Sequence, residues 1–334
     1  MISFILNNEL IQTELPEGMA LVDFIRYESG LPGTKIGCRE GDCGACTVLQ
    51  GIVDHGKVVY KSIVSCLTPL GNAHGTHIVT IEGINMKRLS PVQQAMVDNA
   101  ATQCGFCTPG FIMSFTGYTM SAQPPEKPKA IAAVSGNVCR CTGYKSIERA
   151  ADSINKAMTD KDLENPIQWL VQKNYLPEYF LGIESRLAAI GSPSGNNSGD
   201  VTIGGGTDLM VQKHDVIAES RLHKVHLQNE LKSIEQHGNE IVVGAACTAD
   251  DLAQHAIMRS IFPKIDQYFQ LISSQPIRNT GTVAGNFVNA SPIGDLSIFF
   301  LSLNAWLTLT NGKGKRVVSL KDFFIDYKKT DLKP

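Results

Sequence analysis

The sequence lacks a charge excess, a long apolar run and an N-terminal export signal. Its 30 basic and 32 acidic residues give a formal net charge of -2, so no basic surplus is present to neutralise a phosphate backbone. No stretch approaches the ~20 uninterrupted apolar residues of a membrane span. The first residues also lack the charged and apolar regions of a signal peptide. We therefore expect a cytoplasmic protein that binds neither nucleic acid nor membrane.

Two common cofactor motifs are missing as well. The 8 histidines have no paired metal-ligand spacing, so we assign them no metal. The glycine-rich stretch that follows Ile203 has Leu209 where a dinucleotide fingerprint requires its third glycine. The sequence therefore does not predict a Rossmann nucleotide site.

The 334 residues are enough for several domains, each with its own core. Residues 1–85 contain short strands and one helix, over 21–30, that places Leu21, Phe24 and Ile25 on one face. This pattern predicts a β-grasp, ferredoxin-like domain. The expected strands span 2–8, 10–15, 46–53 and 57–65.

Residues 86–160 change to a helical pattern. Ser90-Pro91 and Thr108-Pro109 are typical helix starts, because proline is tolerated in the first turn. The sequence predicts a domain of four short helices. They are expected over 91–103, 109–122, 129–138 and 146–160.

The remaining chain is expected to form a linker, 161–180, and an α+β domain, 181–334. Strands and helices alternate there, as in many α+β domains. The fold class predicted is therefore multidomain α+β. Strands are expected over 201–205, 224–228, 240–246, 305–311 and 315–320, with a helix over 250–256.

Nine cysteines in a cytoplasmic chain point to metal or redox chemistry rather than to disulfides. Four of them are spaced as in plant-type [2Fe–2S] ferredoxins, with four and then two residues between the first three and a distant fourth. The small residues between them allow backbone N–H groups to point at cluster sulfurs. This set is Cys38, Cys43, Cys46 and Cys66.

A second set of four cysteines consists of Cys104, Cys107, Cys139 and Cys141. One residue separates Cys139 from Cys141, so a disulfide between them would be strained. Cys107 precedes a helix N-terminus, which favours a negatively charged thiolate. Zinc bound by four thiolates is the alternative for both sets. Cys247 stands alone and is expected to be a small buried apolar residue.

The motifs CREGDCGACTV, QCGFCTPG and CRCTGY, in this order, resemble the iron–sulfur part of the xanthine oxidase family of molybdenum hydroxylases. The resemblance implies two [2Fe–2S] clusters, of which the one in the helical domain lies nearest the molybdenum cofactor. It also implies that Gln103 and Cys141 face the pterin of that cofactor, which a large partner subunit holds.

Two further segments, GGGTDL and RNTGTVAGN followed by ASPIGD, resemble the FAD-binding domain of the same family, of the vanillyl-alcohol-oxidase type. Alone, the glycines indicate only side-chain-free backbone that can approach a pyrophosphate, or an ordinary turn. The resemblance implies contacts to FAD from Gly204, Gly205, Gly206, Thr207, Asp208, Thr282, Gly285, Asn286 and Asp295.

The resemblance also places Tyr327 and Lys328 near an incoming NAD, although a solvated surface pair is the alternative. It implies that the FAD-binding domain is incomplete at Pro334.

The resemblance implies an electron-transfer subunit of a xanthine dehydrogenase-type oxidoreductase in purine metabolism. Electrons would pass from molybdenum on a partner subunit through both clusters to FAD and then to NAD, in a hetero-oligomer. No catalytic residue is assigned to this chain. The alternatives are a related aldehyde or N-heterocycle hydroxylase and, from another class, a structural metal-binding interaction module.

Overall fold

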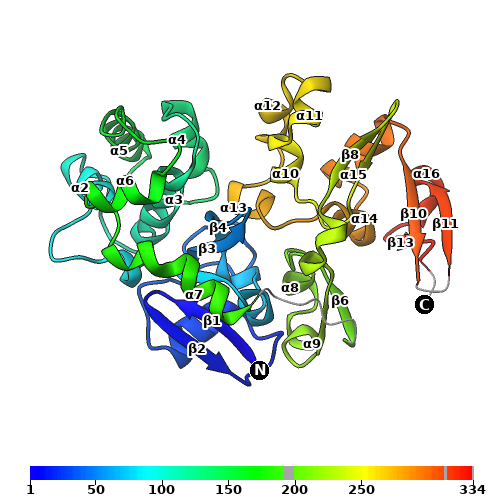
Figure 1. Ribbon diagram of the computed structural model, residues 1–334, viewed down its shortest axis with the longest axis horizontal. Helices are drawn as coiled ribbons and strands as arrows, with labels where there is room; N and C mark the ends of the chain where they lie inside the picture. Colours follow the sequence, from blue (N-terminus) through cyan, green and yellow to red (C-terminus); the bar gives the residue numbers. More distant parts are fainter. Residues whose placement is uncertain (192–198, 312–313, 333–334) are drawn as a thin grey trace.

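The computed structural model describes residues 1–191, 199–311 and 314–332. Figure 1 shows the first of these ranges on the left and the other two on the right. Within the described residues, no helix is long and apolar enough to cross a membrane.

The N-terminal part is a five-stranded mixed sheet that holds a short helix. The strand order is β2-β1-β5-β3-β4, with β1 and β5 parallel and the other neighbours antiparallel. Leu21, Phe24 and Ile25 are buried against the sheet, as their spacing predicted. This is the expected ferredoxin-like arrangement. The elements are β1 (Ile2–Leu6), β2 (Glu9–Thr13), α1 (Leu21–Asp23), η1 (Phe24–Glu28), β3 (Thr47–Asp54), β4 (Lys57–Val64), η2 (Ser65–Leu67), η3 (Leu70–Ala73), β5 (His77–Val79) and η4 (Ile81–Ile84).

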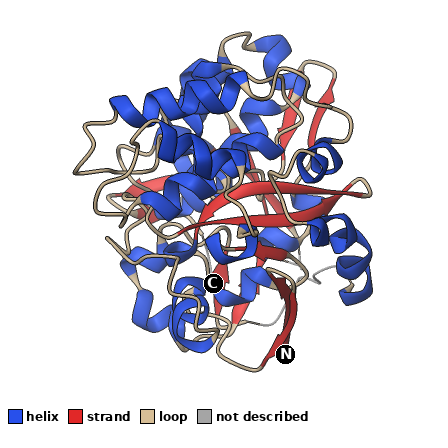
Figure 2. Cartoon of the chain, turned by 90° about the vertical axis from the view of Figure 1, so that its left-hand side faces the viewer, coloured by secondary structure: helices blue, strands red, loops and turns tan. Residues whose placement is uncertain are grey.

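Four helices follow, as predicted. Ser90 caps the first with a capping box that includes Gln93, and Pro91 occupies its first turn. The next helix packs on β3 and β4, and Figure 2 shows the helices gathered against the sheet. Their bounds are α2 (Pro91–Asp98), α3 (Thr108–Met120), α4 (Lys127–Ala133) and α5 (Lys145–Lys156).

The segment 161–190 folds back over these two parts. Trp169 and Leu170 are buried in the core of the helical part, and Ile183 and Leu187 pack on Ile5 of the sheet. The region expected as a linker, 161–180, therefore buries apolar side chains. Its elements and the helix that follows are α6 (Pro166–Gln172), η5 (Glu178–Gly182) and α7 (Ile183–Ile190).

The chain beyond residue 199 forms an α+β region with four two-stranded sheets in its described residues. The strand expected over 224–228 is wrong in part, because 225–227 is a 3-10 helix. The strands are β6 (Val201–Ile203), β7 (Leu222–Lys224), β8 (Ile234–His237), β9 (Glu240–Val243), β10 (Trp306–Thr310), β11 (Lys315–Ser319), β12 (Phe324–Asp326) and β13 (Lys329–Thr330).

The helices of this region are short elements. They are α8 (Leu209–Gln212), α9 (His214–Ala218), η6 (Val225–Leu227), η7 (Asn229–Leu231), α10 (Ala249–Gln254), α11 (Ala256–Ile261), α12 (Ile265–Phe269), α13 (Gln275–Arg278), α14 (Val283–Asn289), α15 (Asp295–Ser302) and α16 (Leu320–Phe323). Cys247 is fully buried in their shared core, as expected.

One apolar cluster joins the two halves of the molecule. It combines Cys46, Cys66 and Leu67 of the ferredoxin-like part with Ile203 and Met210 on either side of the glycine-rich turn. Burial of this shared surface holds the turn against the cysteine loop.

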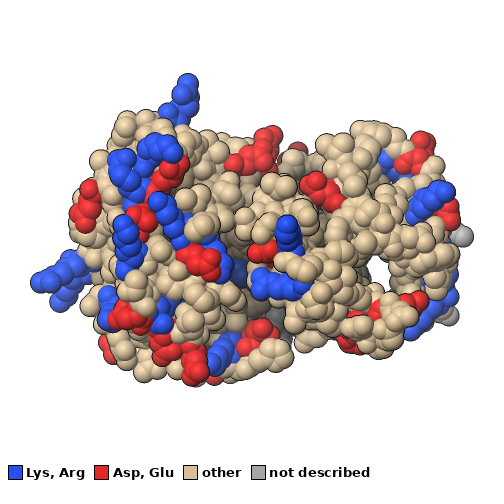
Figure 3. Space-filling view, turned by 90° about the horizontal axis from the view of Figure 1, so that it is seen from above, with Lys and Arg blue, Asp and Glu red and all other residues tan. Residues whose placement is uncertain are grey.

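On the face in Figure 3, basic side chains alternate with acidic ones rather than forming a continuous basic surface.

Candidate functional site

The first four cysteines lie as two pairs beside the β3–β4 hairpin. The thiol of Cys38 contacts that of Cys43, and the thiol of Cys46 contacts that of Cys66. Cys46 and Cys66 are buried, whereas Cys38 and Cys43 are half-buried. Cys46 and Cys66 are 20 positions apart in the sequence. The hairpin brings them together because Cys46 precedes β3 and Cys66 follows β4.

The loop that carries the first three cysteines is held in an unusual backbone conformation. Arg39, Gly41 and Gly44 have φ values of +61°, +82° and +64°, in the left-handed region. The backbone N–H of Glu40 consequently points inward and donates to Cys38 Sγ over 3.3 Å. One backbone donor thus faces a cysteine sulfur, and the hydrogen bonds expected to the sulfurs of a bound cluster stay a prediction.

Arg39 is the one non-glycine residue among the three, and an ion pair fixes it. Its guanidinium donates to both carboxylate oxygens of Asp23, over 2.9 and 2.6 Å. The hydrogen bond to Asp23 raises the pKa of Arg39, although burial opposes this. The bidentate pair attaches the cysteine loop to the end of α1.

The second set of cysteines is also arranged as two pairs. Cys104 and Cys141 Sγ atoms lie 3.6 Å apart, and the Cys107 thiol contacts that of Cys139. Cys107 lies next to the start of α3, as expected, but it is itself the N-cap residue because the helix begins at Thr108 rather than at Pro109. Cys139 Sγ accepts from the backbone N–H of Thr142 over 3.4 Å and from its hydroxyl over 3.1 Å.

The two pairs of the second set differ in exposure. Cys104 and Cys141 are exposed, whereas Cys139 is buried. Gln103, which the resemblance places near a pterin, is exposed beside Cys104. One end of this set therefore faces the surface and the other faces the protein interior.

The paired arrangement fits a two-iron cluster. A [2Fe–2S] cluster distributes four thiolates over two irons. Each set supplies two close pairs and inward N–H donors, which match that requirement.

The two cysteine sets are joined by direct contacts. The carbonyl of Cys43 accepts a hydrogen bond of 3.0 Å from the N–H of Val138, the residue before Cys139. Asn137 is 5% exposed, and its side chain donates to the carbonyl of Gly44 over 3.0 Å. A Cβ atom on Gly44 would lie 2.2 Å from the carbonyl oxygen of Gly136, so only glycine allows this approach.

The glycine-rich turn after β6 packs against the loop before α14. A Cβ atom on Gly204 would lie 2.6 Å from Thr282 Oγ1, and one on Gly205 would lie 1.9 Å from the Thr280 carbonyl oxygen. The turn also reaches the ferredoxin-like part, because a Cβ on Gly206 would lie 3.0 Å from the Leu67 carbonyl oxygen. Because these glycines have no Cβ atom, the loop before α14 and the segment at Leu67 can both pack against the turn.

The predicted FAD contacts on this loop and turn are neighbours in the structure. Thr282 caps α14 by accepting from the N–H of Gly285 over 3.1 Å. Asn286 accepts from the N–H and hydroxyl of Ser297, over 3.0 and 2.9 Å, which ties α14 to α15. Asp295, in contrast, is exposed at the start of α15.

Asp208 is the only acidic residue of the predicted turn. It accepts from Asn289 over 2.8 Å, and burial raises its pKa while the nearby charge of Lys328 opposes that effect. The side chain of Thr207 lies near Gly281. The turn and α14 are thus joined through the hydrogen bond from Asn289 to Asp208.

A cavity of about 340 Å³ opens beside these residues. Tyr327 and Lys328 line it, together with 290–292 at the end of α14. Both side chains are exposed, and Tyr327 is 70% exposed.

Sequence patterns did not indicate the polar contacts between β4 and the FAD-binding region. Lys61 of β4 bonds to Asp251 of α10, 190 positions away. The TADD sequence that starts α10 forms a capping box, in which Thr248 is the N-cap and Asp251 accepts from the N–H of Thr248. Nothing in that local pattern identifies Lys61 as its partner.

Comparison with protein families gives three matches along the chain. Residues 4–70 match the 2Fe-2S iron-sulfur cluster binding domain, and residues 80–152 match the [2Fe-2S] binding domain. Residues 188–334 match the FAD binding domain in molybdopterin dehydrogenase. The matches confirm two [2Fe–2S]-binding domains, an FAD-binding domain and the predicted fold class.

The similar proteins include xanthine dehydrogenase 1 of Arabidopsis thaliana, 28% identical over 96% of this chain and 30% of its own length. A probable aldehyde oxidase of Caenorhabditis elegans is 29% identical over 95% of this chain and 29% of its own length. The chain thus spans about 30% of the curated relatives it matches.

Among solved structures, quinoline 2-oxidoreductase from Pseudomonas putida 86 has 32% identity, with 50% of this chain and 95% of that chain covered. The TM-score of that match is 0.38.

Proposed function

Because this chain belongs to the xanthine dehydrogenase and aldehyde oxidase family of molybdenum hydroxylases, and carries its iron–sulfur and FAD-binding domains, we propose that it is the electron-transfer part of such an enzyme. Electrons come from a molybdenum cofactor on a partner subunit and pass by way of two clusters and FAD to NAD. We propose the boundaries 1–85, 86–160 and 181–334 for the three domains.

The observation that carries the proposal is the spatial order of the sites. The exposed pair Cys104 and Cys141 leads to Cys139, whose neighbour Val138 bonds to the carbonyl of Cys43. The first cysteine set ends at Cys66. Its next residue, Leu67, contacts the glycine-rich turn. The predicted cluster and flavin sites therefore form one continuous series through the protein.

We propose that the eight paired cysteines bind the clusters and that residues 204–208 with 282–286 bind FAD. When bound, the clusters supply one-electron carriers and FAD supplies the hydride donor for NAD. The N–H groups of Glu40 and Thr142 stabilise thiolate charge in the two cysteine sets. Thr282 and Asn286 fix the flavin-binding loop through the hydrogen bonds to Gly285 and Ser297.

We propose a xanthine dehydrogenase-type enzyme that uses NAD. The support is that several of the matched relatives are xanthine dehydrogenases and that Tyr327 and Lys328 line a cavity next to the flavin-binding loop. The matched aldehyde oxidase favours aldehydes as the second candidate substrate class. The exposed end at Gln103, Cys104 and Cys141 is the proposed docking point for the molybdenum subunit.

Anaerobic reduction of the cluster- and FAD-loaded chain by NADH tests the proposal. Flavin absorbance should fall first and cluster absorbance afterwards, since FAD is the proposed NAD site. The same chain should not oxidise purines, because it has no proposed molybdenum site. Reduced flavin that does not pass electrons to the clusters contradicts the proposed electron path. Purine turnover without molybdenum contradicts the proposal that the substrate is oxidised on the partner subunit.

A further inference from the structure

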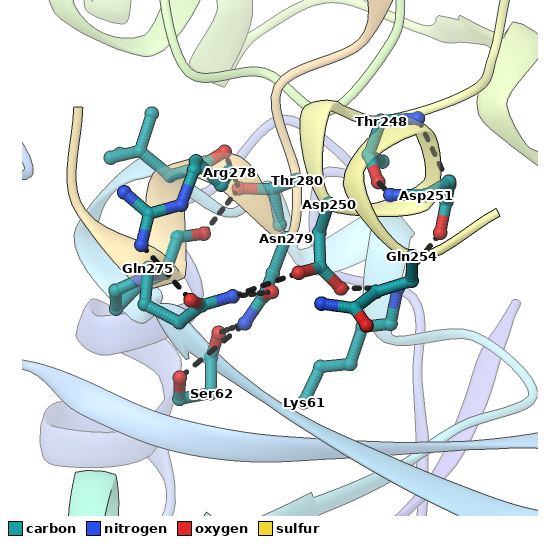
Figure 4. A network of polar contacts seen from close by, with 12 residues as sticks. Lys61, Ser62, Thr248, Asp250, Asp251, Gln254, Gln275, Arg278, Asn279 and Thr280 are labelled. Atoms are coloured by element: carbon teal, nitrogen blue, oxygen red, sulfur yellow. Dashed lines mark hydrogen bonds and ion pairs between the residues drawn. The ribbon is translucent and has the colours of Figure 1, made fainter. Parts of the chain in front are cut away.

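A charged side chain links the ferredoxin-like part to the FAD-binding region. Lys61 lies on β4, and its Nζ is 2.9 Å from Asp251 Oδ1 and 3.5 Å from Asp250 Oδ2, both on α10. The side chains of Lys61 and Asp250 are only 26% and 16% exposed. Figure 4 shows the lysine reaching from the strand towards the helix. The pair of Lys61 with Asp250 is therefore shielded from solvent more than an ordinary surface pair, whereas the Asp251 side chain is 39% exposed.

The contacts continue in a closed ring that returns to the same strand. Gln275 of α13 donates to Asp250 over 3.1 Å and to the side-chain oxygen of Asn279 over 2.8 Å. Asn279 donates in turn to the carbonyl of Ser62 over 2.8 Å. Since Lys61 and Ser62 are adjacent on β4, one short piece of strand holds both α10 and α13 (Figure 4).

The strand and the helices of this ring lead directly to the proposed cofactor sites. β4 ends at Val64, and Cys66 of the first cysteine set follows it. On the other side, Asn279 is followed by Thr280, whose carbonyl contacts Gly205 of the glycine-rich turn. The ring thus lies where the cluster-bearing strand meets the flavin-binding loop.

The charges in the ring depend on each other. Burial works against the charge of Lys61, but the carboxylates of Asp251 and Asp250 outweigh it and raise the pKa of the lysine. Asp251 is fixed independently, because its other oxygen accepts from the N–H of Thr248 in the helix cap. Removal of the lysine charge would remove the ion pairs that join these two partly buried carboxylates to β4, which favours separation of the helix from the strand.

We propose that Lys61 is a positioning residue for electron transfer between the first cluster and FAD. Its bridge to Asp250 and Asp251 holds the flavin-binding loop at a fixed separation from the strand that leads to Cys66. The inference rests on the proposed function, since it needs both cofactors in the places given above. Lys61 touches neither cofactor site itself and acts through α10 and α13.

The test compares Lys61→Met with Lys61→Arg and with Lys57→Met in the cluster- and FAD-loaded chain. Lys57 is an exposed lysine on the same strand, so its variant controls for loss of one positive charge. Rapid reduction with NADH gives the rate of electron transfer from flavin to cluster. Hydrogen exchange of the amides at 279–286 reports separately whether the loop is held. Iron, FAD content and cluster EPR spectra are measured for every variant.

Lys61→Met should slow flavin-to-cluster transfer by roughly 10-fold or more, because a small displacement of reacting groups has large kinetic effects. It should also speed exchange at 279–286, while Lys61→Arg and Lys57→Met behave as the wild type. Equal rates in Lys61→Met and Lys57→Met overturn the inference. So does a loss of rate that merely follows lost iron or FAD. Absence of any transfer in the wild type overturns the proposed function instead.

Discussion

The carbonyl oxygen of Cys43 accepts a 3.0 Å hydrogen bond from the backbone N–H of Val138. This bond joins a residue of the first cysteine set to the neighbour of Cys139 in the second. Because it involves only backbone atoms, it persists whatever side chain stands at position 43. The two sites are therefore mechanically linked, although each is built from its own four thiols.

This linkage makes ligand substitution informative. Cys43→Ser should remove the first cluster and Cys107→Ser the second, so that each variant keeps about half of the iron. The backbone bond from Val138 remains in both, and the unaltered site should therefore keep its cluster. Iron analysis with EPR of each variant checks this. Loss of both clusters from a single substitution contradicts two separately folded sites.

Asn137 provides the side-chain part of the same interface. It donates to Gly44 and accepts from the hydroxyl of Ser114 over 2.7 Å, both while buried. Asn137→Ala leaves these groups without partners and should lower the free energy of unfolding by ~1–3 kcal/mol. Thermal or urea unfolding measures the change. Asn8→Ala, at an exposed position, is the control and should have a small effect.

The glycine-rich turn should tolerate no side chain at Gly205. A Cβ there would lie 1.9 Å from the Thr280 carbonyl oxygen, so Gly205→Ala must push the turn away from the flavin-binding loop. We expect FAD affinity to fall at least ~10-fold, or 1.4 kcal/mol. Gly182→Ala is the matched control, because no atom lies within 4 Å of its added Cβ. Unchanged FAD titrations for Gly205→Ala would show that the turn does not bind the cofactor.

His77 should make the ferredoxin-like sheet sensitive to acid. It is fully buried and bonds to Tyr60 over 2.7 Å, and burial lowers its pKa from 6.5 to about 3. Above pH ~6.5 the imidazole is neutral in both folded and unfolded chains. Below that pH only the unfolded chain gains a proton, so stability falls by up to ~1.4 kcal/mol per pH unit until about pH 3.

Hydrogen exchange of the β1 and β5 amides, corrected for the intrinsic effect of pH, measures this loss. His77→Gln should start from a lower stability but show a shallower decline between about pH 6.5 and pH 5. His237→Gln, at an exposed position, should decline as the wild type does. An unchanged slope in His77→Gln contradicts the assignment of the acid sensitivity to this histidine.

Local sequence signals predicted much of the fold. Ser90-Pro91 starts α2 as expected, and the spacing of Leu21, Phe24 and Ile25 gave the buried face of the first helix. These signals work because a helix cap and an apolar face depend on neighbours in the chain. The matched families likewise confirm the cofactor types that the cysteine spacing indicated.

Other features depend on contacts between distant residues and could not be predicted. The pairing of Cys104 with Cys141 and the bridge from Lys61 to Asp251 join positions 37 and 190 residues apart. The polar stretch 158–166 did not reveal that Trp169, three residues beyond it, would be buried against the helices. The 3-10 helix at 225–227 also replaced part of an expected strand, since short apolar runs are compatible with either structure.

The proposed electron path requires this chain to bind two separate [2Fe–2S] clusters. Iron and acid-labile sulfide analysis of the purified chain, combined with EPR after reduction, tests it most directly. We expect about four irons and four sulfides per chain and two distinct [2Fe–2S] signals of equal intensity. Zinc in place of iron, or a single cluster signal at full metal content, would contradict the account.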